Sequence, residues 1–307
     1  MLGGMIRFSH TLFAMPFAML ALVMAWAMSP TDTTNSVAES AGWMEARFPG
    51  LRWIDLVGVL LCMVCARSAA MAFNRIVDRF VDAENPRTRE RHLPTGVVSV
   101  WAATALTIVA SIGFVAVTLL FLPRNPLPFV CAVPVLIFLL GYSWAKRFTD
   151  LSHYWLGAAL GLAPVGAWVV VRATFLEPAP WLLAVAVACW VGGFDIIYAC
   201  QDTEFDRRRG LHSLPARFGN RVALRLAAVS HGVMLMLLAL MPMVYTPFHS
   251  PTWFIGLAAV GVLLAIEHRL VTPDDLARVN VAFFHVNVLV SFGLLAIGTL
   301  TLLFPSR

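Results

Sequence analysis

Nine long apolar segments alternate with short polar connections along the 307-residue sequence. Their apolar residues form unbroken runs rather than the alternation typical of a half-buried strand, and a run of about 20 can cross a bilayer as a helix. Only helices and closed barrels satisfy every backbone hydrogen bond in lipid, so unbroken runs favour helices. The predicted spans are residues 11–29, 54–77, 98–121, 127–143, 154–172, 180–199, 222–243, 252–267 and 281–303.

The composition agrees with an integral membrane protein. The chain is 60% hydrophobic and 13% charged, whereas a soluble domain ordinarily carries about 25% charged residues. The first segment, residues 11–29, lacks a clear small-residue cleavage site and is followed by further spans, which argues against a signal peptide. We therefore predict an all-α fold, a multi-pass bundle of about nine transmembrane helices in a single domain that covers residues 1–307.

Two cysteines in the second span form a CxxC pattern, Cys62 and Cys65. Such a pair can bind metal or carry out redox chemistry. No second CxxC in the sequence completes a four-ligand zinc site, and both cysteines lie within the predicted span. A structural role is therefore the stronger interpretation.

The positive residues predict the orientation of the chain. With the N-terminus inside, sixteen of the 22 Lys and Arg lie in inner connections, five lie in outer ones, and Arg67 lies within a span. Positive residues favour the cytoplasmic side, which predicts an inner-membrane protein with its N-terminus inside and its C-terminus outside.

Several inner arginines are also candidates for binding an anionic substrate. The net charge of +5 suits anionic headgroups or such a substrate, and no basic domain outside the membrane suggests nucleic acid. No obligate protein partner is evident.

The second span ends in an acidic motif, NRIVDRFVD, residues 74–82. Asn74, Asp78 and Asp82 recur every four residues, so they share one face of the helix. Carboxylates near membrane depth are costly and mark functional sites by default, although charged residues at helix ends are often only interfacial.

The sixth span ends in a second acidic motif, DIIYACQDTEFD, residues 195–206. Asp195, Asp202 and Asp206 are spaced by seven and four residues and also share a face, with Tyr198 on the same side. Like the first motif, this one precedes several arginines and a Leu-Pro pair.

The matched motifs predict a parallel internal repeat. The two motif spans lie four helices apart in the chain, so both run in the same direction and both acidic clusters meet at the cytoplasmic end of one cavity. Magnesium is bound by carboxylates together with substrate phosphates, and arginines bind the remaining phosphate oxygens through forked hydrogen bonds. The pattern therefore predicts a site for Mg²⁺ and a diphosphate, which the metal turns into a good leaving group.

These motifs resemble those of the UbiA superfamily of intramembrane prenyltransferases, especially its 4-hydroxybenzoate polyprenyltransferase branch. The resemblance covers nearly the whole chain. The segments that carry it are RFSHTLFAMPFA, NRIVDRFVD with NPRTRERHLPTG, GYSWAKRFT, DIIYACQDTEFD and GLHSLPARFG. The resemblance implies a Mg²⁺-dependent enzyme of quinone biosynthesis, which transfers a polyprenyl chain from its diphosphate to an aromatic acid.

The resemblance also implies roles for individual residues. Asn74, Asp78 and Asp82 match the first diphosphate and magnesium motif, and Asp202 and Asp206 match the second. Asp195 matches an acidic position close to the acceptor, Arg67 a basic residue of the central pocket, and Tyr142 and Lys146 a loop that closes over the diphosphate. Two further substrate-binding candidates come from position alone: Tyr198, which lies between Asp195 and Asp202 on the helix, and Arg7, which precedes the first span.

Some alternatives stay open at this point. Arg7 either lines the pocket or acts as a snorkelling anchor at the membrane surface. Asp195 either serves the acceptor or is a structural partner of Arg67. A transporter with repeated acidic helices is a competing interpretation, although its charges would lie at the midplane. A phosphatidyl-type transferase is another, but its typical DGxxAR motif does not occur in the sequence. Within the prenyltransferases, GFDIIYACQDTEFDRRRGLHSLPARFG also resembles a menaquinone (futalosine-route) subgroup, whose acceptor would be a dihydroxynaphthoate rather than 4-hydroxybenzoate.

Overall fold

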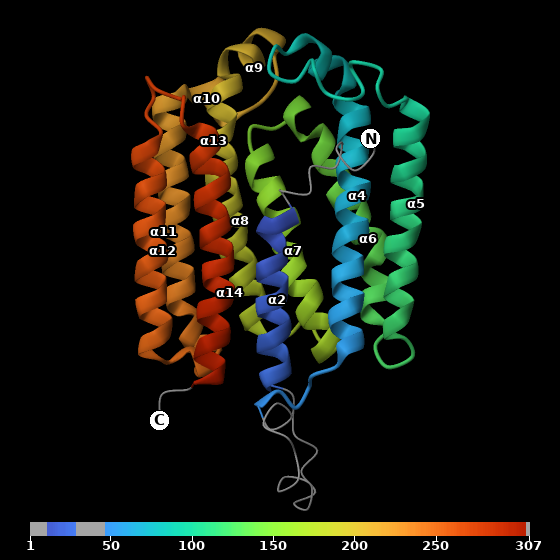
Figure 1. Ribbon diagram of the computed structural model, residues 1–307, viewed down its shortest axis with the longest axis vertical. Coiled ribbons are helices and arrows are strands. Elements are labelled where there is room, and N and C mark those ends of the chain that lie inside the picture. The colour runs from blue at the N-terminus through green and yellow to red at the C-terminus, as the bar shows by residue number, and fades with distance from the viewer. Residues whose placement is uncertain (1–10, 29–46, 305–307) are drawn as a thin grey trace, which may run out of the picture.

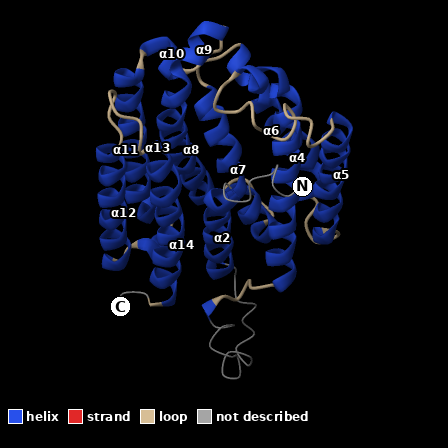
Figure 2. Cartoon of the chain, turned by 45° about the horizontal axis from the view of Figure 1, so that its top comes forward, coloured by secondary structure: helices blue, strands red, loops and turns tan. Residues whose placement is uncertain are grey.

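The computed structural model describes residues 11–28 and 47–304, and this part of the chain is helical with no strand (Figures 1 and 2). The long helices are α2 Thr11–Met28, α4 Trp53–Glu84, α5 Val100–Thr118, α6 Leu127–Gly141, α7 Ser152–Arg172, α8 Pro178–Ala199, α11 Asn220–Val244, α12 Pro251–Leu270 and α14 Asn287–Leu303. The short helical segments are η2 Leu119–Phe121, η3 Tyr142–Arg147, η4 Cys200–Asp202, α9 Thr203–Arg209, α10 Leu214–Phe218, η5 Thr246–Phe248, α13 Val279–Val281 and η6 Ala282–Val286.

The prediction of an all-α membrane bundle is confirmed. Eight described segments are long and apolar enough to cross a membrane, and α2 adds a shorter apolar helix, which agrees with about nine spans. Two predicted boundaries were too short. The second span continues from residue 77 to Glu84, and helical structure continues past residue 199 through η4 and α9 to Arg209. Both extensions carry motif aspartates whose carboxylates are paired with cationic side chains, so these polar turns remain helical.

The connections between helices gather at two ends of the bundle (Figure 1). We call one the motif end; its connections are residues 85–99, 142–151, 200–219 and 271–278. The opposite end contains residues 47–52, 122–126, 173–177 and 245–250. Helices α4 and α8 both run towards the motif end, as the parallel repeat predicted, so the two acidic motifs lie at the same end.

Helices α7 and α8 approach each other closely because small residues face one another. A Cβ atom on Gly157 would lie 2.3 Å from the carbonyl oxygen of Ala188, and one on Gly161 would lie 2.6 Å from that of Ala184. Small residues spaced by four allow membrane helices to pack backbone against backbone. This contact fixes the position of α8, which carries the second motif, relative to the start of α7.

The core of the bundle surrounds α2, which lies between α4 and α14 in both views (Figures 1 and 2). Phe13 and Phe17 of α2 are buried and pack against Trp190 and Phe194 of α8, with the Phe17 and Trp190 ring centroids 5.0 Å apart. Phe283, in the π-helical turn η6, packs on Phe13 and Phe194. Such π-helical turns are frequent at functional sites, and this one borders the cavity described next.

Candidate active site

A cavity of about 260 Å³ lies near the motif end, between the two motif helices. Ten residues predicted from the sequence line it: Arg67, Asn74, Asp78, Asp82, Tyr142, Lys146, Asp195, Tyr198, Asp202 and Asp206. The eleventh, Arg7, lies outside the described residues. The structure thus brings all the described candidates to one place, while their chemical roles stay predictions.

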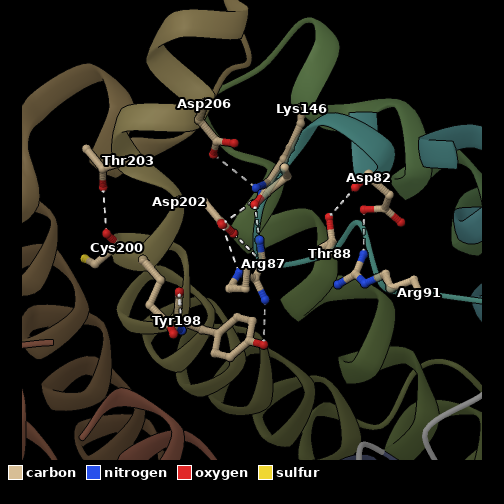
Figure 3. Close-up of polar contacts among 12 residues, drawn as sticks. Asp82, Arg87, Thr88, Arg91, Lys146, Tyr198, Cys200, Asp202, Thr203 and Asp206 are labelled. Carbon is tan, nitrogen blue, oxygen red and sulfur yellow. Dashed lines mark hydrogen bonds and ion pairs between the residues drawn. The ribbon is translucent and has the colours of Figure 1, made fainter. Parts of the chain in front are cut away.

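Asp202 is bound by the connection that follows the first motif helix (Figure 3). Arg87 forks onto its carboxylate: Nε donates to Oδ1 over 2.9 Å and Nη2 donates to Oδ2. Asn85 Nδ2 donates to Oδ1 over 3.1 Å, and Arg87 Nη1 donates to Tyr198 Oη over 2.9 Å. Burial lowers the pKa of Arg87, but the hydrogen bond and negative charge of Asp202 outweigh it and raise that pKa above its ordinary value. The two motifs are therefore directly joined.

Asp206, one turn further on, faces the predicted closing loop. Lys146 Nζ in η3 lies 3.2 Å from Asp206 Oδ2. The backbone of the loop is held as well, because His212 N donates to the carbonyl of Lys146 over 2.7 Å. The Asp206 side chain is only 3% exposed and that of Lys146 is 34% exposed. Lys146 thus lies between a buried carboxylate and the open part of the cavity.

Asp78 of the first motif has partners on α4 and on η3. Asn74 Nδ2 donates to its Oδ2 over 2.8 Å, as the spacing of four residues predicted for one helix face. Arg147 Nη2 donates to its Oδ1 over 3.2 Å. The segment Tyr142–Arg147 therefore contributes one cation to each motif: Lys146 to the second and Arg147 to the first.

Asp82 is the more buried aspartate of the first motif. Arg91 Nη1 donates to its Oδ1 over 2.7 Å (Figure 3). Its Oδ2 is buried and accepts no hydrogen bond from any described residue, and Arg75 Nη1 lies 3.8 Å away. This oxygen therefore keeps hydrogen-bonding capacity that no described side chain uses, with the charge of Arg75 beside it.

Asp195 lies deeper in the cavity, at the start of the second motif. Among the described residues, its hydrogen-bond partner is His153 rather than Arg67: His153 Nδ1 and Asp195 Oδ2 are 2.6 Å apart. Aromatic side chains of Phe194, Tyr198 and Phe283 line the cavity beside it, with the Tyr198 and Phe283 ring centroids 4.4 Å apart. A planar ring held here would have a carboxylate near it and aromatic faces around it.

A second pocket, of about 280 Å³, continues from the floor of the cavity. Its wall is almost entirely apolar and comes mainly from α4, α5, α6 and α7. Five residues line both spaces: Arg67, Ala70, Leu139, Ala159 and Leu160. Arg67 is therefore the polar residue at the junction between a charged compartment and an apolar one.

The charges of the cavity suit an anion together with a metal ion. Six cationic side chains and five carboxylates line it, which gives a net charge of +1. Within residues 11–28 and 47–304, no group of three His, Cys, Asp or Glu side chains forms a complete metal site. A metal at these aspartates would therefore need further oxygen ligands, and phosphate oxygens supply them.

Several residues that contact the predicted aspartates were not named individually from the sequence, and Arg87 and His153 are the two most informative of them. Arg87 belongs to the basic run after the first motif, and its signal was its place directly after Asn85-Pro86, where the chain turns back towards the second motif. His153 carried a weaker signal, because a polar residue in the first turn of a span is usually interfacial. Only the close packing of α7 on α8 brings it to Asp195.

Comparison with known proteins agrees with this geometry. The model of the UbiA prenyltransferase family matches residues 40–289. A 4-hydroxybenzoate octaprenyltransferase of Nitrosomonas eutropha is 31% identical over 76% of this chain and 79% of its own length. That of Cupriavidus necator is 32% identical over 80% and 84%.

Solved structures show the same fold. The apo structure of a UbiA homolog from Aeropyrum pernix K1 superposes with a TM-score of 0.79 at 28% identity, covering 96% of this chain and 98% of the other. A UbiA homolog from Archaeoglobus fulgidus bound to GPP and Mg²⁺ has a TM-score of 0.62 at 18% identity, covering 96% and 99%. The family predicted from the motifs is thus confirmed: this chain belongs to the UbiA prenyltransferase family and is a membrane-embedded prenyltransferase.

Proposed function

We propose that this enzyme transfers a polyprenyl group from polyprenyl diphosphate to a hydroxylated aromatic acid in quinone biosynthesis, with Mg²⁺ as its cofactor. One observation carries the proposal. The charged cavity that holds both aspartate motifs opens, at Arg67, into an apolar pocket. A substrate with an anionic head and a long apolar tail matches this pair of compartments, whereas a small hydrophilic solute would leave the apolar pocket unused.

The diphosphate would bind at the motif end, among cations that already line the cavity. The side chains of Arg87, Arg91, Lys146 and Arg147 are between 26% and 35% exposed, so each can turn from its aspartate to a phosphate oxygen. Arg87 and Arg91 offer forked donors that match phosphate geometry, and Lys146 offers a compact charge. Binding would therefore replace the carboxylate partner of each cation with a phosphate oxygen, so each cation would keep an ion pair.

The motif aspartates fit Mg²⁺, a hard cation that prefers oxygen ligands. Asp78 and Asp82 on one side, with Asn74, and Asp202 and Asp206 on the other would hold it. The buried Asp82 Oδ2, which accepts no hydrogen bond from a described residue, is the clearest free ligand. When bound, the metal supplies charge that stabilises the departing diphosphate. A protein of the same fold has been solved with GPP and Mg²⁺, so the fold can accommodate this pair.

The acceptor would bind at Asp195, between the diphosphate and the aromatic side chains of Phe194, Tyr198 and Phe283. The allylic C–O bond breaks with its electron pair on the diphosphate, a ring carbon of the acceptor attacks the freed allylic carbon, and the ring loses a proton. Asp195 orients the acceptor hydroxyl and receives the proton that the ring loses. The two relatives compared above are named for 4-hydroxybenzoate, which makes this acid the first acceptor to test and dihydroxynaphthoate the second.

The direct test is an assay of the purified chain in detergent or nanodiscs with a short prenyl diphosphate and each acceptor in turn. We expect prenylated product with one acceptor, loss of product with chelator, and recovery with Mg²⁺. Absence of product with both acceptors, although the prenyl diphosphate binds, would reject the proposed acceptor class. Unchanged turnover in the presence of chelator would reject the metal.

We also propose that the motif end faces the cytoplasm, since it carries most of the positive residues. An introduced cysteine within residues 30–50 should react with an impermeant reagent added outside. One at Arg89, in the motif-end connection, should react only after the membrane is opened. The reverse pattern would overturn the orientation and leave the chemistry of the site unaffected.

A further inference from the structure

A buried histidine lies directly behind the acceptor side of the cavity. His153, in the first turn of α7, is fully buried, and its Nδ1 lies 2.6 Å from Oδ2 of Asp195 on α8. Asp195 itself lines the cavity and is 18% exposed. The pair thus joins a residue that faces the substrate space to one that does not.

The roles of the two partners follow from their chemistry. An ionised carboxylate only accepts hydrogen bonds, so the Nδ1–H of His153 donates to it. The other ring nitrogen, Nε2, is buried and has no hydrogen-bond partner within the described part of the chain. The hydrogen bond that the imidazole makes is therefore the one to Asp195. With Oδ2 committed to His153, Oδ1 is the oxygen that Asp195 presents to the cavity.

The helix packing brings the two side chains together. Helices α7 and α8 run antiparallel, and side chains lean towards the N-terminus of their own helix, so His153 and Asp195 lean towards each other. One turn away, Gly157 packs directly against the backbone of Ala188, so the two helices approach closely beside the pair. The carboxylate of Asp195 is therefore contacted by a neighbour that is fully enclosed by the surrounding packing.

We infer that His153 is a positioning residue, which fixes the Asp195 carboxylate so that Oδ1 points at the hydroxyl of the aromatic acceptor. The inference rests on the proposed function, since it assigns Asp195 to the acceptor. His153 does not touch the substrate and acts only through Asp195. An error of about 1 Å in such a group can cost about 10²-fold in rate, so its loss affects the acceptor reaction far more than the binding of the diphosphate.

The test compares three substitutions that separate position from volume. His153→Asn keeps an N–H donor close to the place of Nδ1, His153→Gln moves the donor towards the place of Nε2, and His153→Leu keeps volume without a donor. We expect the Leu and Gln variants to lose about 10- to 100-fold in kcat/KM for the acceptor, and the Asn variant to recover most of it. Affinity for the prenyl diphosphate, measured by direct titration, should change less than twofold in all three.

His231 provides the matched control. It is equally buried, and its Nε2 also bonds to α8, but to the backbone carbonyl of Trp190 rather than to Asp195. We expect His231→Leu to lower the thermal midpoint in detergent while the acceptor KM stays at the wild-type value. If His153→Leu behaved in the same way, His153 would be only a structural contact and the inference would be overturned.

A double-mutant cycle tests whether His153 acts through Asp195. If His153 acts through Asp195, then His153→Leu has no further effect on acceptor kinetics in an Asp195→Asn background. Additive losses would show an independent role and reject the inference. Failure of the proposed function looks different: the wild-type protein itself would prenylate neither acceptor, whereas failure of the positioning role leaves wild-type turnover intact and His153→Leu equal to it.

Discussion

The two ends of the bundle use the same pairing of carboxylate and arginine in different ways. At the motif end, Arg87 forks onto Asp202 across 115 residues of sequence, and both side chains line the cavity. At the opposite end, Arg172 forks onto Glu177 only five residues away, with Nη2 2.5 Å from Oε1. Trp168 Nε1 donates to the same carboxylate over 2.5 Å.

The difference lies in what surrounds each pair. Arg172 also donates to the carbonyl of Met28, the last residue of α2. The cluster therefore joins the end of α2 to α7 and to the start of α8. Neither Arg172 nor Glu177 lines either of the two spaces described above. At the motif end the pairs join the motif aspartates to the connection that follows α4 or to η3, and all of these side chains line the cavity. Under the proposed function, the ion pairs that serve the substrate are those whose side chains line the cavity, whereas the pair at the opposite end holds helices together.

The largest effect is expected from the motif aspartates. Asp78→Asn, Asp82→Asn, Asp202→Asn and Asp206→Asn should each lower turnover by about 10²-fold or more, because the Mg²⁺ that would stabilise the departing diphosphate loses a ligand. Turnover at saturating substrate is the measurement. Glu177→Gln at the opposite end should keep wild-type turnover. Near-normal rates in all four aspartate variants would reject the assignment of the diphosphate to this end.

A smaller effect is expected when each forked arginine becomes lysine. Lysine keeps the charge but loses the planar fork. Arg87→Lys should raise the KM for prenyl diphosphate about tenfold, which corresponds to about 1.4 kcal/mol. Arg172→Lys should leave this KM unchanged and lower the thermal midpoint instead. A KM effect of equal size in both variants would show that the two ends are not separated in function.

The helical bundle and the acidic faces of the motif end could be predicted from the sequence, whereas the pair at the opposite end was not predicted. The spacings of Asn74, Asp78 and Asp82 placed one acidic face correctly, because helical periodicity is a local property. The partners of those aspartates were not predictable in the same way. Arg87 reaches Asp202 through a chain reversal, and His153 reaches Asp195 through the packing of Gly157 on Ala188, which depends on three-dimensional contacts rather than on spacing.

The packing of α7 on α8 can be tested by a single methyl group. Gly157→Ala would place Cβ 2.3 Å from the carbonyl oxygen of Ala188, and a backbone atom in a helix cannot yield cheaply. Overpacking of this kind typically costs about 1–3 kcal/mol. The thermal midpoint should fall, and the acceptor KM should rise because His153 and Asp195 are pushed apart. Gly232→Ala on α11 is the control, since its Cβ would meet nothing within 4 Å and should leave both quantities near wild type.

The smallest effect concerns acid stability at the opposite end. Burial raises the pKa of Glu177, but the hydrogen bonds from Arg172 and Trp168 outweigh it and hold that pKa below its ordinary 4.5. A carboxyl group with a lowered pKa in the folded state contributes stability above its unfolded pKa, and the contribution is lost as the pH falls through the folded value. The pair is partly exposed, so it contributes no more than about 1 kcal/mol to the free energy of unfolding.

Glu177→Gln cannot ionise and lacks this contribution at every pH. Thermal midpoints of the two proteins should therefore differ at pH 7 and converge as the pH falls below 4.5. Other carboxylates titrate in both proteins and cancel in the difference. A difference that stayed constant down to strong acid would mean that Glu177 acts through packing against Trp168, and that the opposite end does not depend on charge at all.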